Sequence, residues 1–290
     1  MGRCGSCTLS GWWARSKHKH HGCGEFISSY GSTTSNYVAL YDQFNLAWKL
    51  ALVLNSYAKL SLLDSYESER LPVVSEMLNI STKLHGESLG ARGDTIENLK
   101  LADQNSPWHR GWKLFQLDVN YRWSNVVFDE RYKQVERKAE AYGIEGHDIR
   151  AGDRSPDAPG LIIARSGSGG EGDKTRLFDI FKPTKHTILI LLTDADANKS
   201  LSWVQPVISK IEKLAPGLFT MALIIPNATP DGVVPNVGVD YVLKDSDGHA
   251  FKNFGLEGKS YIVIVRPDGI VGAFASDVAG VEHYLSLVFL

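Results

Sequence analysis

The chain has 290 residues, of which 43% are hydrophobic and 22% are charged, and its net charge is −2. This is the composition of a globular protein of about two domains, and the near-neutral charge excludes the basic surface that nucleic acids or anionic membranes require. No apolar run reaches the roughly 18 residues needed to cross a bilayer, and three cysteines, none beyond Cys23, favour a reducing, cytoplasmic setting without a disulfide framework.

Residues 1–36 are rich in Gly, Ser, His and Cys and show no period of 2 or 3.6. We expect a disordered or non-homologous leader, because such a segment cannot supply its own core. Cys4 and Cys7 have redox-motif spacing and could join Cys23 and nearby histidines around zinc. No strand or helix is visible around them, so we predict adventitious metal binding and no designed metal site.

Residues 37–150 are expected to be mainly helical. From Asp42 onward the apolar residues recur mostly at spacings of three and four, which predicts one buried helical stripe. Asp42 is a candidate N-cap or first-turn acid, where its charge meets the helix dipole. A second helix is predicted from near Leu62 to Leu84, with a break or kink at Pro72.

The rest of this region gives weaker patterns. Residues 113–121 alternate as a strand does, and residues 130–141 read as a charged helix. Aromatic residues also gather here and could line an aromatic-substrate pocket, although packing between domains is the more common role of such a cluster. They are Trp108, Trp112, Tyr121 and Trp123.

Residues 151–290 are predicted to form a separate α/β domain. A hairpin turn is predicted at Arg266-Pro267-Asp268-Gly269, since Pro fixes φ and Gly tolerates positive φ. The order of strand, helix, strand, hairpin and closing helix is that of a thioredoxin-like layered fold. The domain contains no cysteine, so thiol chemistry is excluded and a structural or binding role is expected. The predicted strands are 161–164, 187–192, 218–225, 261–265 and 270–274, and the predicted helices are 201–214 and 278–289.

Residues 167–172 satisfy the G-x-G-x-x-G pattern of dinucleotide-binding loops. The residues that follow, 173–176, lack the small apolar side chains with which such a helix packs on its strand. We therefore favour a surface loop, the usual role of a Gly/Ser run.

Several motifs resemble one family in order: DQFNLAWKL, SLLDSYESERLPV, DVNYRWSNVVFDER, GDRSPDAPG, RLFDIFKPTKHTILIL and VIVRPDG. Over residues 40–290 the chain is similar to the C-terminal part of class A FAD-dependent aromatic monooxygenases of the phenol-hydroxylase-like kind. The implied fold class is α/β, with a mainly helical flavin-domain remnant followed by a thioredoxin-like α/β sandwich domain that helps form a dimer.

The resemblance implies FAD as cofactor, NADPH as reductant and a phenolic ring as substrate. The family places Gly-Gln-Gly-Met-Asn, then four residues, then Asp before this helix, and its backbone lies over the flavin. This chain has Gly31 to Tyr41 leading to Asp42, with Asn36 one place out of register. Asp42 and Asn45 are the candidate cofactor-binding residues that match, and no catalytic residue can be assigned.

Two hypotheses follow. The first is an FAD-dependent phenol-hydroxylase-like monooxygenase, truncated before residue 37 and inactive alone. The domains are then a leader at 1–36, a flavin-domain remnant at 37–150 and a thioredoxin-like, non-redox domain at 151–290. The alternative is a non-catalytic interaction module that forms a homodimer through residues 151–290.

Overall fold

The computed structural model describes residues 43–90, 119–132, 139–142, 148–167, 169–193, 197–214, 217–229, 237–256 and 258–290. Asp42, the leader and its cysteines, Trp108 and Trp112 lie outside these ranges, as does most of the predicted strand at 113–121. No helix among the described residues is long and apolar enough to cross a membrane.

The described residues divide into two compact units that do not follow the order of the sequence. The strand unit comprises residues 156–261. The helix–hairpin unit combines the described residues up to Ser155 with residues 262–290. The predicted boundary near residue 151 lies close to the change of unit, whereas the final residues of the chain group with the helices near its beginning.

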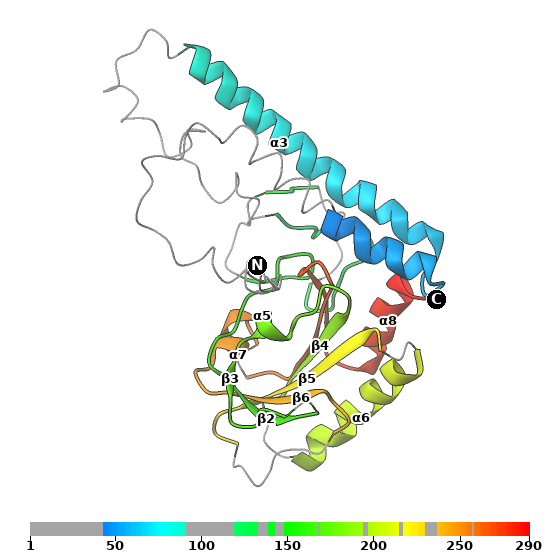
Figure 1. Cartoon of the computed structure of the whole chain (residues 1–290), viewed down its shortest axis with the longest axis vertical. Coiled ribbons are helices and arrows are strands. Elements are labelled where there is room, and N and C mark those ends of the chain that lie inside the picture. Colours follow the sequence, from blue (N-terminus) through cyan, green and yellow to red (C-terminus); the bar gives the residue numbers. More distant parts are fainter. Residues whose placement is uncertain are drawn as a thin grey trace, which may run out of the picture. The chain divides into compact units, whose positions relative to one another are not determined.

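The strand unit is a mixed sheet with helices (Figure 1). Three parallel strands continue into two antiparallel ones, in the order β4-β5-β6-β2-β3. Their apolar runs fit burial on both faces, and every residue of β4 is buried. The elements are β2 (Leu161–Ser166), β3 (Lys174–Thr175), α5 (Leu177–Ile180), β4 (His186–Leu191), α6 (Ala197–Leu214), β5 (Phe219–Pro226), β6 (Tyr241–Asp245) and α7 (His249–Asn253).

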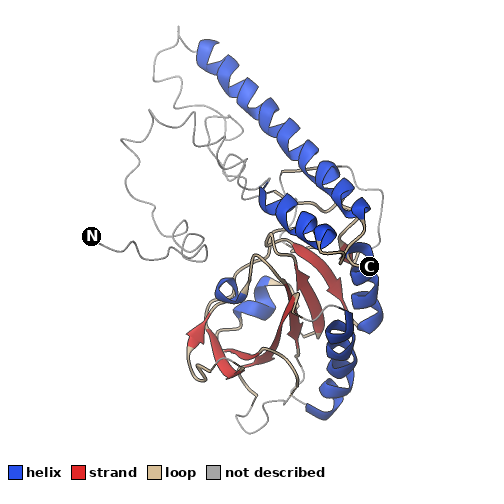
Figure 2. Ribbon diagram, turned by 45° about the vertical axis from the view of Figure 1, so that its right-hand side comes forward, coloured by secondary structure: helices blue, strands red, loops and turns tan. Residues whose placement is uncertain are grey.

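The helix–hairpin unit contains α3, which is the longest of the described helices and is drawn in blue in Figure 2. Residues 43–54 are helical, and after a turn the chain enters η1 (Leu60–Leu63) and α3 (Asp64–Gly90). The strands are β1 (Phe128–Asp129), β7 (Tyr261–Val265) and β8 (Val271–Ala275), and the chain closes with α8 (Val278–Val288). β8 pairs antiparallel with β7 and parallel with β1. Asp277 caps α8 by accepting a hydrogen bond from the Gly280 backbone N–H.

The predicted hairpin turn between β7 and β8 is confirmed. The backbone N–H of Arg266 donates to the carbonyl of Ile270 at 2.8 Å, and that of Gly269 donates to the Arg266 carbonyl at 2.9 Å. Gly269 has a φ of 79°, which residues with a side chain adopt at a cost. The predicted strands and helices of residues 151–290 also appear, each within four residues of its expected bounds.

Of the break or kink predicted at Pro72, the break is wrong, because α3 runs through this residue without interruption, and a kink stays a prediction. Proline has no N–H, so the carbonyl of Ser68, four residues earlier, loses its normal helical donor. The indole Nε1–H of Trp123 donates to that carbonyl at 2.9 Å. A tertiary hydrogen bond thus replaces the missing one, and the helix continues.

The predicted charged helix at 130–141 is also wrong in its described residues, where 130–132 form a turn and 139–141 have no regular secondary structure. Glu130 accepts hydrogen bonds from the backbone N–H and hydroxyl of Ser276, and Arg131 pairs with Asp129 at 2.9 Å. These side chains hold the turn against β8 and α8, so tertiary contacts override a helical pattern.

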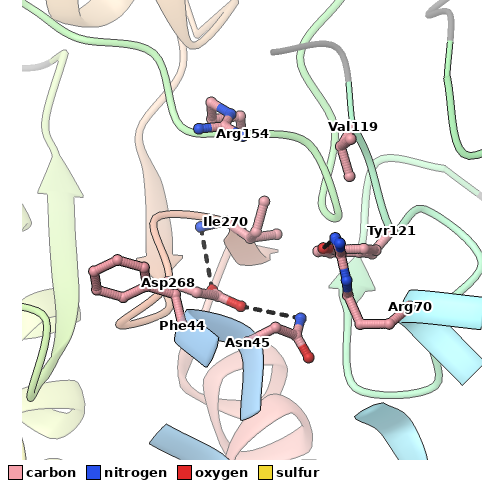
Figure 3. A pocket seen from close by; sticks show the side chains of 8 residues that line it. All are labelled: Phe44, Asn45, Arg70, Val119, Tyr121, Arg154, Asp268 and Ile270. Atoms are coloured by element: carbon pink, nitrogen blue, oxygen red, sulfur yellow. Dashed lines mark hydrogen bonds between the residues drawn. The ribbon is translucent and has the colours of Figure 1, made fainter. Parts of the chain in front are cut away.

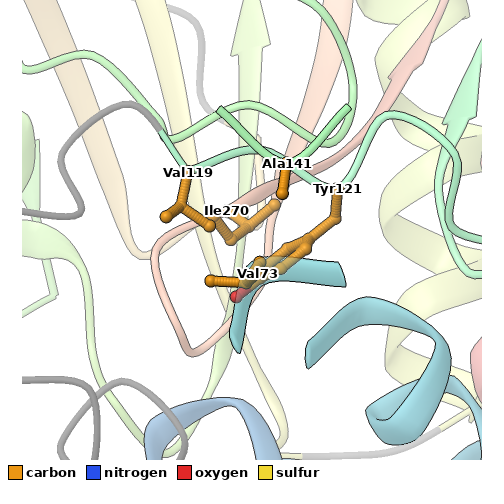
Figure 4. Packing of buried hydrophobic residues seen from close by; sticks show 5 residues of the cluster. All are labelled: Val73, Val119, Tyr121, Ala141 and Ile270. Atoms are coloured by element: carbon orange, nitrogen blue, oxygen red, sulfur yellow. The ribbon is translucent and has the colours of Figure 1, made fainter. Parts of the chain in front are cut away.

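A small apolar cluster joins α3 to the loops that follow it and to the hairpin (Figure 4). Val73 of α3 packs with Val119, Tyr121, Ala141 and Ile270, all of them buried. The rings of Tyr121 and Trp123 meet edge to face with centroids 6.1 Å apart. Of the predicted aromatic cluster, the two described members therefore serve packing.

Candidate functional site

Four charged side chains meet in the interior of the helix–hairpin unit, and we refer to them as the charge cluster: Lys49, Glu69, Arg266 and Asp268. Lys49 lies on the helix over residues 43–54, Glu69 on α3, and the other two on the β7–β8 turn. The side chains of Lys49, Glu69 and Arg266 are fully buried, and that of Asp268 is 4% exposed. Burial of charges is costly unless they are paired and hydrogen-bonded, and the geometry meets both conditions.

The carboxylate of Glu69 is the centre of the cluster. Arg266 donates to it through both terminal nitrogens, at 2.8 and 3.0 Å, in the bidentate arrangement typical of strong Arg–carboxylate pairs. Lys49 Nζ donates to Oε2 at 2.9 Å and Asn45 Nδ2 donates to the same oxygen at 2.6 Å. The hydroxyl of Ser124 donates to Oε1 at 2.6 Å. Each oxygen is therefore fully hydrogen-bonded.

Asp268 joins the hairpin to the helix (Figure 3). Its Oδ2 accepts from Trp48 Nε1 at 3.2 Å, from Asn45 Nδ2 at 3.3 Å and from Arg266 Nη2 at 2.5 Å. Its Oδ1 accepts from Arg266 Nε at 3.1 Å and from the Ile270 backbone N–H at 3.4 Å. Oδ1 thus bonds only within the turn, while Oδ2 bonds both to the turn and to the helix.

The cluster shifts the protonation equilibria of its members. Burial by itself would raise the pKa of Glu69, but Arg266 and Lys49 outweigh that effect and hold the pKa well below its usual range. Burial by itself would lower the pKa of Arg266, and Asp268 and Glu69 reverse this and raise it further. Both side chains are charged throughout the ordinary pH range.

The pKa of Lys49, in contrast, shifts in the direction that favours the neutral form. Burial, aided by the positive charge of Arg266, lowers its pKa from 10.5 to about 8 despite the attraction of Glu69. Lys49 and Arg266 together balance the two carboxylates below that pH. The amine also donates to Asn45 Oδ1 at 2.9 Å.

Aromatic rings enclose the cluster. The guanidinium of Arg266 lies 5.0 Å from the ring centroid of Trp48 and 5.7 Å from that of Tyr121, within the range of cation–π attraction. The hydroxyl of Tyr121 accepts a hydrogen bond from Arg70 Nη1 at 2.8 Å. Burial raises the pKa of Tyr121 to about 12, so its hydroxyl remains protonated.

A small cavity adjoins the cluster (Figure 3). It has room for about one water molecule. The described residues therefore enclose no space for a dinucleotide or a phenol here. The lining residues are Phe44, Asn45, Arg70, Val119, Tyr121, Arg154, Asp268 and Ile270.

Of the two candidate cofactor-binding residues, only Asn45 lies in the described part of the chain. Its side chain is 1% exposed and is engaged by Lys49, Glu69 and Asp268. Contact of Asp42 or Asn45 with a cofactor stays a prediction. The charge cluster itself was not predicted, although the spacing of Asn45 and Lys49, one helical turn apart, could have drawn attention to it.

The glycine pattern at 167–172 does not open a helix. It connects the antiparallel strands β2 and β3, and the backbone N–H of Gly172 donates to the Ile163 carbonyl at 2.8 Å. A dinucleotide-binding loop must lead into a helix, so the loop interpretation holds. Within the described ranges, no group of three or more His, Cys, Asp or Glu side chains is arranged to hold a metal ion.

Residues 33–81 match a protein family described as an FAD binding domain. The matched stretch contains the helix over residues 43–54 and the first part of α3, and so includes Lys49 and Glu69. The chain is therefore similar to class A FAD-dependent aromatic monooxygenases, which confirms the resemblance seen in the motifs. FAD is the cofactor that this relationship implies.

Two curated relatives are aromatic hydroxylases. Pentachlorophenol 4-monooxygenase of Sphingobium chlorophenolicum is 27% identical over 241 residues, which are 82% of this chain and 38% of the relative. Phenol 2-monooxygenase of a Pseudomonas species is 25% identical over an alignment of 283 positions that covers 88% of this chain and 40% of the relative. The chain thus spans about two fifths of the length of these relatives.

A solved structure supports the fold. The flavin-dependent monooxygenase PieE, in complex with FAD and substrate, aligns with a TM-score of 0.50 at 21% identity, over 87% of this chain and 43% of that one. The likeness shows a mixed α/β fold of the kind found in such a monooxygenase. The thioredoxin-like layering of residues 151–290 and the helical remnant at 37–150 stay predictions.

The described residues do not by themselves fit FAD. The polar groups of the charge cluster are saturated by one another, and the cavity beside them is the size of a water molecule. What these residues provide is the support of two helices in the stretch that matches the FAD-binding family.

Proposed function

We propose that the chain is part of an FAD-dependent monooxygenase that hydroxylates phenolic rings with NADPH as the reductant. The observation that carries the proposal is the match of residues 33–81 to an FAD binding domain, joined to relatives that act on phenol and pentachlorophenol and cover more than four fifths of this chain. In this class the flavin supplies the oxygen chemistry and protein groups hold and shield it.

We further propose that these 290 residues alone do not catalyse the reaction. In the family a glycine-rich backbone lies over the flavin before the helix, and this chain has Gly31-Ser32-Thr33-Thr34-Ser35 in that region. A side chain at these positions hinders the close backbone approach that a nucleotide requires, so FAD binding by this chain should be weak. The role assigned to the described residues is to fix the two helices, not to contact reacting atoms.

The non-redox, thioredoxin-like character of residues 151–290 and their role in a homodimer belong to the same proposal, as does a cytoplasmic setting. Light scattering of the purified chain over a range of concentrations checks the dimer. A monomer at every concentration would remove that part of the proposal.

The cofactor is tested by titrating the purified chain into FAD and following quenching of flavin fluorescence, with FMN as the control ligand. We expect quenching by FAD that is weak enough for a desalting column to remove the yellow colour. Absence of any FAD-specific quenching would contradict the assignment. Phenol-stimulated NADPH oxidation with a hydroxylated product would instead contradict the proposed inactivity of the chain alone.

A further inference from the structure

We propose that the β7–β8 turn, acting through Asp268, is a positioning element for the helix over residues 43–54. The bonds themselves are independent of any cofactor. Their meaning for a flavin site rests on the proposed function, because that helix lies inside the stretch that matches an FAD binding domain.

The hydrogen bonds that Asp268 accepts from both the turn and the helix support this role. Oδ1 accepts only within the turn, from Arg266 Nε and the Ile270 backbone N–H. Oδ2 accepts from Arg266 Nη2 in the turn and also from the indole N–H of Trp48 and the amide of Asn45. These helix residues are separated from Asp268 by 220 and 223 positions in the sequence. One buried carboxylate therefore fixes the rotation of the first turns of this helix about its axis and their position along that axis, although the two segments are far apart in the sequence.

Charge makes the contact specific. Within the charge cluster Asp268 and Glu69 balance Lys49 and Arg266, so neutralising Asp268 leaves an excess positive charge in the interior. Apolar packing alone tolerates small rotations of a helix, whereas hydrogen bonds to a charged acceptor are directional. The helix is consequently held in one orientation by the turn.

Trp48 contacts two residues of the turn. Its ring packs against the guanidinium of Arg266, and its N–H donates to Asp268, so the turn fixes the position of this side chain. The C-terminal segment thereby becomes a determinant of the geometry of the family-matched helix, without touching a cofactor.

The test compares Asp268→Asn with Asp153→Asn in the full-length protein. Asp153 is a matched control, since its side chain is also buried in the same unit, at 1% exposed against 4% for Asp268, and bonds Arg122 at 2.6 Å and the backbone N–H of Arg150 at 2.8 Å. Amide hydrogen exchange over residues 43–54 is the primary measurement. We expect Asp268→Asn to accelerate exchange there by about tenfold or more, with a smaller change in α8.

Equal acceleration over residues 43–54 by both variants, or none by Asp268→Asn, would overturn the proposal. If Asp268→Asn fails to fold, Trp48→Phe gives a second test, because it removes the N–H donor, keeps a smaller aromatic ring and leaves the charges of the cluster unchanged. It should accelerate the same amides by a few fold, and unchanged exchange would count against the proposal in the same way.

FAD titration separates this inference from the proposed function. If the wild-type protein binds FAD, Asp268→Asn should weaken binding by about tenfold and Asp153→Asn should not; equal weakening contradicts a positioning role. If the wild type binds no FAD, the proposed function fails, and the exchange experiment still decides whether the turn positions the helix.

Discussion

Replacement of Glu69 by glutamine probes the interior of the helix–hairpin unit most directly. The amide keeps the size of the carboxylate but removes its charge, and it turns an N–H₂ donor toward Arg266, Lys49 or Ser124, all of which are themselves donors. Two buried cations are then balanced by Asp268 alone. Removal of one partner from a buried ion pair costs about 3–5 kcal/mol.

The expected loss is large enough to measure by urea unfolding. With a slope of about 2 kcal/mol per molar urea, a cost of about 4 kcal/mol lowers the midpoint by roughly 2 M. Amide exchange in α3 identifies the unit that is affected. The difference between wild type and Glu69→Gln should shrink in acid, because the pKa of Glu69 is lowered in the folded state, so its stabilisation is present above pH 4.5 and lost as pH falls.

Glu76→Gln is the matched control, since Glu76 lies on the same helix but is exposed. Its effect should stay within about 0.5 kcal/mol. A cost below about 1 kcal/mol for Glu69→Gln, or a cost equal to that of the control, would refute the view that this carboxylate neutralises the interior.

Three other substitutions test separate contacts. The first is Lys49→Met, for which the stability of wild type relative to the variant should rise by about 3 kcal/mol as pH increases from about 8 to 10.5. The reason is that the pKa of Lys49 is lower in the folded than in the unfolded chain, so the unfolded chain keeps the proton to higher pH. A difference in urea midpoints that does not change with pH would contradict this. The second is Trp123→Phe, which should lower the free energy of unfolding by about 1 kcal/mol, and by less in a Pro72→Ala background that restores the helical N–H donor. A double-mutant cycle without coupling would count against the hydrogen bond from Trp123 to the Ser68 carbonyl. Gly272→Ala should cost about 1–3 kcal/mol in a thermal melt, because its Cβ would lie 2.5 Å from the hydroxyl oxygen of Tyr284; unchanged stability would show that this ring can move.

The elements of residues 151–290 could be predicted because their signals are local. Apolar runs such as 186–191 are long enough for a strand, and the turn at Arg266-Pro267-Asp268-Gly269 carries its own backbone preferences. Where local preference and tertiary contact disagreed, the contacts prevailed. Pro72 sits in an unbroken helix because Trp123 replaces its missing donor, and Glu130 bonds Ser276 instead of continuing a helix.

The charge cluster could not be predicted, because it is formed by tertiary contacts and has no local signal in the sequence. Lys49 and Glu69 are twenty positions apart, and Arg266 is 197 positions beyond Glu69, so no periodicity connects them. A lysine or glutamate on an amphipathic helix is normally solvated. Only the folded arrangement reveals that these two face inward, where Asn45 links them to the turn.

The grouping of residues 262–290 with the helices near the beginning of the chain has a consequence for biosynthesis. While the ribosome is still translating, Glu69 has no guanidinium to pair with until Arg266 has emerged from the exit tunnel. Until then the early helices are exposed and their charged side chains lack their partners, which is the kind of nascent intermediate that chaperones recognise. A premature stop codon after residue 261 would remove Arg266 and Asp268, and so would also affect helices encoded at the opposite end of the message.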